Sequence, residues 1–236
     1  MKRLDWNAID LVVFDVDGTL YDQRRLRLAM LRQLLAHSWH ARSLDALRTL
    51  GTFRRIREEL GNAPDVSFVD AQYARTASRH NKTPEEVRLL AAEWIERRPL
   101  PLLAGCRYPG VEELFAGLRA QRKHIAVFSD YPALDKLAAL GLRADTVVCA
   151  TDPAIGRLKP DPAGLLEILR ISGAAPERAV MIGDRADRDG AAARAARVNA
   201  LLLAGRPHPE FDTFRSYADP VFRPLLRSAA ASPQAA

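Results

Sequence analysis

The chain has 236 residues, of which 48% are hydrophobic and 27% are charged, and its formal net charge is +6. This composition is ordinary for a globular protein with a core, and no apolar run approaches the roughly 20 residues of a membrane-spanning helix. The first ten residues lack the apolar stretch of a secretory signal, which argues against export. Two isolated cysteines, Cys106 and Cys149, do not make a disulfide framework, so we expect a cytoplasmic protein.

The first predicted element is a strand at residues 11–16, a short apolar and β-branched run that ends in a polar cluster. The next stretch has no strand-like run and is rich in Leu, Ala and Arg, which predicts helices. Their ranges are 26–40, 44–61, 66–78 and 84–98. The last helix has a strong start signal, because Thr83 fits the N-cap, Pro84 the first turn and Glu86 the third position.

Beyond residue 106, strands and helices alternate. Further strands are predicted at 125–129, 146–150, 179–183 and 200–203, with helices at 111–122, 133–140 and 163–171. Residues 228–236 are rich in Ala and Ser and are expected to fray. Alternating strands and helices indicate an α/β fold with a parallel sheet covered on both faces. We therefore predict a core domain of residues 1–20 and 107–236 and an inserted all-helical domain of residues 21–106.

The positive charge is concentrated in the inserted segment. Residues 22–107 hold 16 Lys and Arg against 10 Asp and Glu, whereas the rest of the chain is balanced. A basic segment attracts an anionic substrate or a nucleic acid, but an arginine-rich solvated surface explains the same count. Nucleic acid is the weaker alternative, since the sequence has no recognisable binding module and no basic stripe interleaved with aromatic residues.

The first strand runs directly into Asp15-Val16-Asp17-Gly18-Thr19. Side chains at i and i+2 point the same way, so Asp15 and Asp17 are expected at one side of the strand's carboxyl end, where open parallel sheets bind ligands. One carboxylate can act as a nucleophile and the other as a proton donor, and a divalent cation would relieve their repulsion. A turn or a calcium loop is the ordinary alternative, but the Thr-Leu-Tyr-Asp-Gln that follows does not supply the ligand pattern of a calcium loop.

Two later segments offer groups that would hold a phosphoryl oxygen. Ser129 and Asp130 end the second predicted strand, where a hydroxyl and nearby backbone amides are available. Lys159 is followed by prolines that stiffen its loop and lower the entropy cost of placing its ammonium group. Each alone has a simpler explanation, which is a turn former for the serine and a solvated loop residue for the lysine.

The fourth predicted strand leads into Gly183-Asp184 and two more acids, Asp187 and Asp189. Three aspartates would complete an oxygen-rich site of the kind that magnesium binds. Acids at a helix N-terminus, where they interact favourably with the helix dipole, are the alternative explanation. Together, the polar groups at these strand ends indicate phosphoryl chemistry far more strongly than any one of them does alone.

These residues resemble the four motifs of the haloacid dehalogenase superfamily. The matching motifs are Asp15-x-Asp17-Gly-Thr, Ser129, Lys159 and Gly183-Asp184-x4-Asp189. The similarity extends from residue 11 to about residue 203, and residues 119–141 and 159–189 resemble the phosphoglycolate-phosphatase-like branch. The resemblance implies a Rossmann-like core, and it implies that residues 21–106 are the helical cap of that superfamily; we call this segment the cap.

The resemblance also implies a role for each residue. Asp15 would attack phosphorus and form an aspartyl phosphate, while Asp17 would protonate the leaving alcohol and then activate water. Ser129, Lys159 and the backbone amide of Asp130 would bind the phosphoryl oxygens. Relatives often carry Asn at the position of Asp130, and a carboxylate that points inward there would weaken anion binding.

The resemblance further implies a magnesium ion. The Asp184 carboxylate, the Asp15 carboxylate and the Asp17 backbone carbonyl would bind it. Asp189, or alternatively Asp187, would hold the metal or its waters. Magnesium suits such a site because it prefers oxygen ligands and retains several waters.

Several alternatives follow from the same resemblance. Dehalogenases lack an acid at the position of Asp17, and phosphonatases lack it too and use a cap lysine, whereas the cap here has only Lys82. A phosphomutase uses the same two aspartates and stays open, as does a non-catalytic binding module, although such modules usually lose a catalytic carboxylate. The favoured prediction is a magnesium-dependent phosphatase of a small phosphorylated metabolite, a monomer or homodimer with no membrane partner.

The cap is expected to choose the substrate. Its clustered arginines are candidates for binding a second anionic group, and they are Arg24, Arg25, Arg27, Arg54, Arg55 and Arg57. Trp39, Tyr73 and Trp94 are candidates for lining a cap pocket, although packing in a core is the more ordinary role of such side chains.

Overall fold

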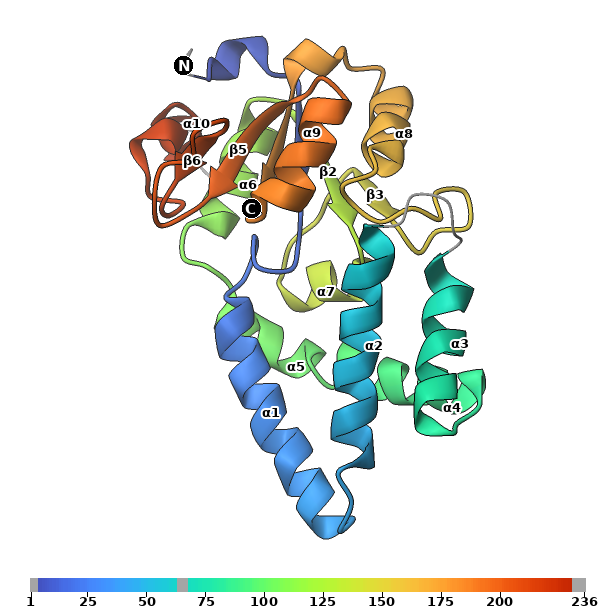
Figure 1. Ribbon diagram of the computed structural model, residues 1–236. Coiled ribbons are helices and arrows are strands. Elements are labelled where there is room, and N and C mark those ends of the chain that lie inside the picture. The colour runs from blue at the N-terminus through green and yellow to red at the C-terminus, as the bar shows by residue number, and fades with distance from the viewer. Residues whose placement is uncertain (1–3, 63–67, 231–236) are drawn as a thin grey trace.

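The computed structural model describes residues 4–62 and 68–230 and shows an α/β protein built on a six-stranded parallel sheet (Figure 1). The strand order is β3-β2-β1-β4-β5-β6, and every neighbouring pair is parallel. The strands are β1 (Leu11–Phe14), β2 (His124–Ser129), β3 (Thr146–Cys149), β4 (Ala179–Gly183), β5 (Asn199–Leu203) and β6 (Asp212–Phe214). The predicted fold class is confirmed, and the five predicted strands correspond to β1 to β5.

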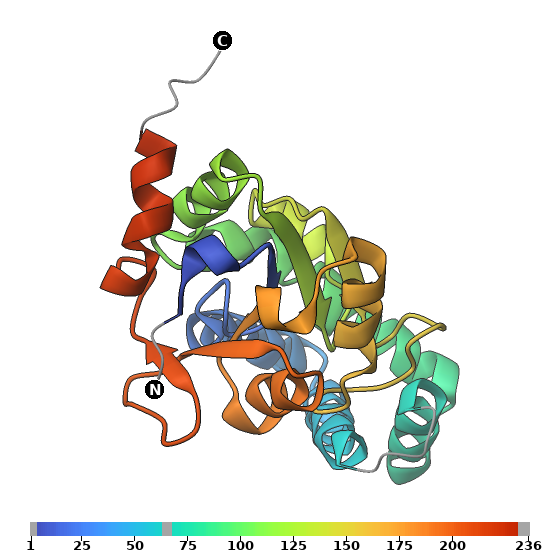
Figure 2. The same ribbon diagram turned by 90° about the horizontal axis from the view of Figure 1, so that it is seen from above.

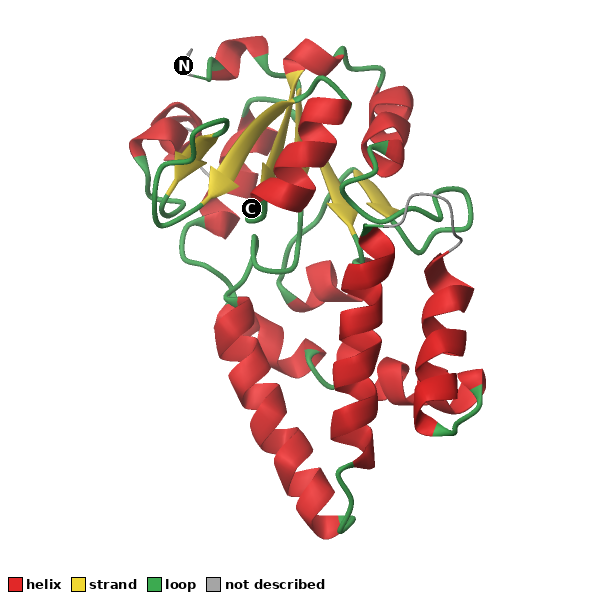
Figure 3. Ribbon diagram, viewed as in Figure 1, coloured by secondary structure: helices red, strands yellow, loops and turns green. Residues whose placement is uncertain are grey.

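Helices cover both faces of the sheet (Figures 2 and 3). Successive side chains of β1 point to opposite faces, so that Val12 and Phe14 join the core that contains α6 and α10, while Leu11 and Val13 join the core that contains α8 and α9. The helices of this region are α6 (Val111–Ala120), α7 (Leu134–Ala139), α8 (Ala163–Ser172), α9 (Ala191–Ala195) and α10 (Arg223–Ala230). The wholly apolar strand runs follow from burial on both faces.

The end of the chain contains a strand that the sequence did not predict, and a helix that extends into the predicted frayed segment. Strand β6 was not expected, because it has three residues, of which only Phe214 is buried, and is too short to show a pattern. Residues 228–230, which were expected to fray, belong to α10, whose Leu225 packs in the core. Residues 231–236 lie outside the described residues.

The cap is helical in the described residues. Its helices are α1 (Gln23–His40), α2 (Asp45–Gly61), α3 (Phe68–His80), α4 (Pro84–Ala91) and α5 (Leu100–Leu103). The capping box of Thr83 and Glu86 starts α4 as predicted, but the helix continues past Ala91 as a π-helical segment, Ala92–Arg97. The first two residues of the helix predicted at 66–78 lie outside the described residues.

The chain enters and leaves the cap side by side, at the carboxyl ends of the strands (Figure 1). The Asp22 amide donates to the Cys106 carbonyl at 2.8 Å, and the Tyr108 amide donates to the Leu20 carbonyl at 3.1 Å. The division into two domains at residues 20/21 and 106/107 stays a prediction, which this pairing supports. In the ranges 4–62 and 68–230, no helix combines the length and the apolar character needed to cross a membrane.

Candidate active site

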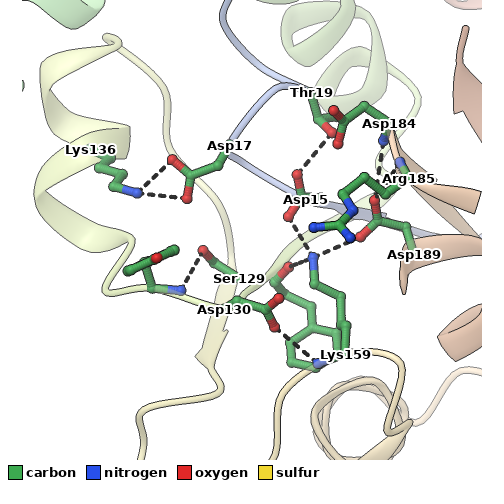
Figure 4. A network of polar contacts seen from close by, with 12 residues as sticks. Asp15, Asp17, Thr19, Ser129, Asp130, Lys136, Lys159, Asp184, Arg185 and Asp189 are labelled. Carbon is green, nitrogen blue, oxygen red and sulfur yellow. Dashed lines mark hydrogen bonds and ion pairs between the residues drawn. The ribbon is translucent and has the colours of Figure 1, made fainter. Parts of the chain in front are cut away.

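The carboxyl ends of β1 and β4 bring Asp15, Asp184 and Asp189 together, and the loop after β3 adds Lys159 (Figure 4). Strand β1 lies between β2 and β4, so the residues that follow these three strands emerge at one edge of the sheet. The order of the strands therefore assembles side chains that are far apart in the sequence.

Lys159 is the centre of a buried ionic cluster. Its Nζ lies 2.5 Å from Oδ1 of Asp15 and 2.7 Å from Oδ1 of Asp189. The other Asp15 oxygen, Oδ2, accepts a hydrogen bond from the Thr19 hydroxyl at 2.9 Å. Only 2% of Lys159 and 6% of Asp15 are exposed, so these contacts replace the water that each charge has lost. The Asp15 carboxylate is consequently held in one orientation.

Two glycines permit this close approach. Gly18 has φ +102°, and a Cβ atom there would lie 2.4 Å from Oδ2 of Asp184. A Cβ atom on Gly183 would lie 2.4 Å from the side chain of Asp189. Both positions therefore need glycine, the first for its backbone conformation and both for the space that a side chain would take.

Asp189, and not Asp187, faces the cluster. Oδ2 of Asp189 accepts hydrogen bonds from the backbone amides of Asp184, at 3.2 Å, and Arg185, at 3.0 Å. The Asp187 side chain is 66% exposed and forms an ion pair with Arg185 at 2.8 Å. The turn of Ala186–Gly190 thus directs one acid inward and the other toward solvent.

The acids form a group that could hold a cation. Carboxylate oxygens of Asp15, Asp184 and Asp189 lie within 4.8 Å of one another. The donor set is entirely oxygen, which fits a hard divalent cation. The carboxylates around Lys159 also outnumber its single charge, so a further positive charge would complete the balance.

The pKa values of these groups reflect the excess of negative charge in the cluster. Burial raises the pKa of Asp15 well above its ordinary value against the opposing effect of Lys159, and the carboxylates of Asp189 and Asp184 add to it. Burial, with the charge of Asp189, raises the pKa of Asp184 to about 6. Burial opposes the charge on Lys159, but Asp15 and Asp189 outweigh it and raise the pKa of that ammonium group well above its usual range.

Asp17 lies in the same cleft but contacts a different cation. Both of its oxygens accept from Nζ of Lys136, at 2.6 and 2.7 Å, and its Oδ1 also accepts from the Tyr21 hydroxyl. Burial alone would raise the pKa of Asp17. The charge and hydrogen bonds of Lys136, together with the hydrogen bond from Tyr21, have the larger effect, so the pKa of Asp17 is lowered. Lys136 was not among the predicted site residues; in the structure it is buried at helical spacing from the buried residues Ala133 and Leu140.

Ser129 and Asp130, at the carboxyl end of β2, accept hydrogen bonds from backbone amides. The Ser129 hydroxyl is fully buried and accepts from the Tyr131 amide at 3.2 Å. Oδ1 of Asp130 accepts from the Lys159 backbone amide at 3.0 Å. The Asp130 carboxylate therefore positions the lysine loop, and its own burial raises its pKa.

A cleft of about 1200 Å³ opens between the strand ends and the cap. Asp15, Asp17, Lys159, Asp184 and Asp189 line its inner side. Five of the six predicted cap arginines also line the cleft, and they are Arg24, Arg27, Arg54, Arg55 and Arg57. The cleft therefore combines the acids and lysines at the strand ends with arginines from the cap.

The aromatic candidates lie elsewhere. Trp94 is buried and packs against His37, and Tyr73 packs against Phe53. Both side chains therefore pack inside the cap, which is the ordinary role of such residues. Trp39 is 83% exposed, because it lies on the outer face of α1. Within the described residues, none of the three aromatic candidates lines the cleft.

Side chains from α2 join the cap to the strand ends. Arg57 donates to the Asp130 carbonyl, and its guanidinium carbon lies 3.8 Å from the centre of the Tyr131 ring. Glu58 accepts from Arg185 at 2.9 Å and from Arg188 at 3.2 Å. The cap and the sheet are thus connected beside the cleft.

Comparison with known proteins shows the family. The haloacid dehalogenase-like hydrolase model matches residues 9–197. The chain belongs to this family. It is 33% identical to a phosphoglycolate phosphatase of Nitrosococcus oceani, over 92% of this chain and 93% of that protein. It is 32% identical to a phosphoglycolate phosphatase of Mesorhizobium japonicum, over 74% of each protein.

Among solved structures, a 2-haloacid dehalogenase of Pseudomonas syringae superposes with a TM-score of 0.63, covering 94% of this chain and 98% of that one. The two sequences are 24% identical, so this likeness shows the haloacid dehalogenase fold and nothing about the reaction. The family membership makes the chain an enzyme of the hydrolase class, and the phosphatase names of its relatives support a phosphatase.

Proposed function

We propose that the protein is a magnesium-dependent phosphatase that hydrolyses a small phosphorylated metabolite through an aspartyl phosphate on Asp15. The main support is the buried cluster of Asp15, Lys159 and Asp189, with Asp184 beside it, in the wall of a cleft. The relatives named phosphoglycolate phosphatase make phosphoglycolate the first substrate to test.

In the first step, a carboxylate oxygen of Asp15 attacks phosphorus in line with the leaving oxygen. The bond from phosphorus to Asp15 forms as the bond to the leaving group breaks. Lys159 and Thr19 fix the two Asp15 oxygens, so little reorientation is needed before attack. The Lys159 ammonium also neutralises charge on the phosphoryl oxygens, where most of the catalytic stabilisation of phosphoryl transfer arises.

Asp17 supplies and removes the proton. Lys136 and Tyr21 favour the carboxylate form of Asp17 before a substrate binds. The negative charge of a bound phosphoryl group opposes that effect, so Asp17 takes up a proton as the substrate enters. The protonated carboxyl group then donates this proton to the leaving oxygen and releases an alcohol. The resulting carboxylate then takes a proton from a water molecule that attacks phosphorus, and this attack frees Asp15 and releases phosphate. The position of Asp17 in the cleft, beside but separate from the Asp15 cluster, supports this division of roles (Figure 4).

The residues present fit a magnesium ion, since Asp15, Asp184 and Asp189 bring carboxylate oxygens within 4.8 Å of one another. Asp184 and Asp15 would bind it with the Asp17 backbone carbonyl, and Asp189 would hold the metal or its waters. Bound magnesium would neutralise phosphoryl charge and align the group for attack. Asp189 meanwhile anchors the loop that carries Asp184 through two backbone amides.

The cap arginines support an anionic substrate. Arg24, Arg27 and Arg54 line the cleft and are exposed, so their charges can meet a second anionic group of the metabolite. Both cysteines are buried and free, which supports a reducing cytoplasm as the location. Static light scattering would decide between a monomer and a homodimer.

The test measures phosphate release from a panel of phosphorylated metabolites, first with magnesium and then with EDTA. Asp15→Asn is expected to lower release by about a thousandfold or more, because it removes the nucleophile. Asp10→Asn is the matched control, since Asp10 precedes the same strand at its opposite end and is exposed. Unchanged release by Asp15→Asn, or full activity in EDTA, would contradict the proposal.

A further inference from the structure

Lys136 is a buried cation that the proposed reaction has not used. It lies on α7, 119 residues from Asp17 in sequence, and its side chain is 9% exposed. Its Nζ contacts both oxygens of Asp17, at 2.6 and 2.7 Å, and the Asp17 side chain is 15% exposed. A buried lysine costs free energy unless it is paired, so this contact holds both side chains in place.

The site therefore contains two separate carboxylate–ammonium pairs. Lys159 holds Asp15, and Lys136 holds Asp17, on opposite sides of the view in Figure 4. Lys136 also lines the cleft, with Nζ 5.1 Å from the centre of the Tyr131 ring. Its ammonium thus fixes the second carboxylate from the side of the cleft wall, as Lys159 fixes the first.

The hydrogen bonds distinguish the two Asp17 oxygens. Oδ1 accepts from Lys136 and also from the Tyr21 hydroxyl, whereas among the described residues Oδ2 accepts from Lys136 alone. Oδ2 is therefore the oxygen with more remaining capacity to exchange a proton with a ligand. Lys136 and Tyr21 together fix the plane of the carboxyl group, and hence the direction in which Oδ2 points.

We propose that Lys136 is a positioning residue for proton transfer, which orients Asp17 so that Oδ2 meets the leaving-group oxygen. This inference rests on the proposed phosphatase function. In the step it assists, the proton leaves Asp17 Oδ2 for the leaving oxygen as the bond from phosphorus to that oxygen breaks. Lys136 gains and loses no proton and does not touch phosphorus.

The dependence of the rate on the leaving group tests this role. An alkyl phosphate such as phosphoglycolate needs a proton on its leaving oxygen, whereas p-nitrophenyl phosphate releases a stable phenolate without one. We expect Lys136→Met to lower kcat/KM for phosphoglycolate by about tenfold or more, and for p-nitrophenyl phosphate by about threefold or less. The ratio kcat/KM is the right quantity because it covers only the steps up to departure of the leaving group.

Three variants make the test specific. Lys136→Arg keeps a cation and is expected to restore part of the loss with phosphoglycolate. In an Asp17→Asn background, Lys136→Met is expected to cause little further loss, because the residue acts through Asp17. Lys123→Met is the matched control, since Lys123 is a partly buried lysine that donates to the Trp6 and Ile9 carbonyls away from the cleft, and its loss should not depend on the leaving group.

The outcomes separate the two proposals. If wild type is active and Asp15→Asn is inactive, but Lys136→Met slows both substrates equally or neither, the positioning role is wrong and the phosphatase proposal stands. Equal loss in the presence and absence of Asp17 would also overturn it. If wild type releases no phosphate from any substrate, the phosphatase proposal fails and the positioning role fails with it. Thermal melting of each variant shows whether a loss of rate reflects unfolding.

Discussion

The two walls of the cleft differ in how their charges are matched. On the sheet side, Asp15, Lys159 and Asp189 are buried and paired with one another. On the cap side, Arg24, Arg27 and Arg54 are exposed, and in residues 4–62 and 68–230 none of them forms an ion pair. The buried cluster is therefore organised before a ligand arrives, whereas these three arginines have charges available for a ligand.

Substitutions on the two sides of the cleft should therefore differ in their effects on stability and on activity. Removing one member of a buried pair leaves its partner uncompensated, at a cost of about 3–5 kcal/mol, and also disturbs the reacting groups. Removing an exposed arginine costs little stability. Changes on the sheet side should therefore alter rate and metal binding, and changes on the cap side should alter KM.

Among the substitutions that compare the two sides of the cleft, the largest effect is expected at the two acids that follow Asp184. Asp189→Asn is expected to raise the magnesium concentration needed for half-maximal activity by about 10- to 100-fold, because it weakens the support of the metal ligands. Asp187→Asn, which alters an exposed side chain in the same turn, is expected to change it by about twofold or less. A magnesium titration of phosphate release measures both, and the reverse ranking would contradict the inward role of Asp189.

An intermediate effect is expected at the cap wall. Arg54 lines the cleft, and we propose that it meets a second anionic group of the substrate. Arg54→Gln should therefore raise KM for phosphoglycolate by about three- to tenfold with a smaller change in kcat. The control is Arg75→Gln, an exposed arginine of α3 that does not line the cleft. Steady-state kinetics with phosphoglycolate and p-nitrophenyl phosphate would refute the arginine role if KM rose equally for both.

The smallest effect is expected where cap and sheet are joined. Burial raises the pKa of Glu58, but Arg185 and Arg188 outweigh it and lower the pKa below 4.5. Its stabilisation is therefore complete above pH 4.5 and is lost as the pH falls through the lowered folded-state pKa. Glu58→Gln should lower stability at pH 7 by about 1 kcal/mol or less, since the side chain is 56% exposed, and by nothing measurable in acid. Denaturant unfolding at both pH values measures this, and a pH-independent difference would contradict it.

The sequence predicted the residues that form the buried Asp15 cluster. Asp15, Lys159 and Asp189 follow strands or a stiffened loop, and the order of parallel strands alone brings their positions to one edge. The choice between Asp187 and Asp189 needed the structure, because it depends on the π-helical turn Ala186–Gly190, which no periodicity indicates.

Lys136 shows why the remaining site residues were missed. A lysine in a helix is ordinarily a solvated side chain. Lys136 is buried because it contacts Asp17, and the two are 119 residues apart in the sequence, so the helix alone does not predict the contact. The cap arginines were recognised as a cluster, but the sequence could not show that Arg25 lies outside the cleft lining while Arg24 lies in it. Such differences depend on the rotation of α1 about its own axis, which tertiary packing sets.

The most direct measurement is to trap the phosphorylated enzyme. Protein mixed with phosphoglycolate and magnesium is quenched in acid, digested and analysed by mass spectrometry. A phosphoryl group on the peptide at Asp15, absent from Asp15→Asn, is the expected result. Phosphate release by wild type with no phosphorylated peptide, or with the phosphoryl group on another residue, would contradict the nucleophilic role of Asp15.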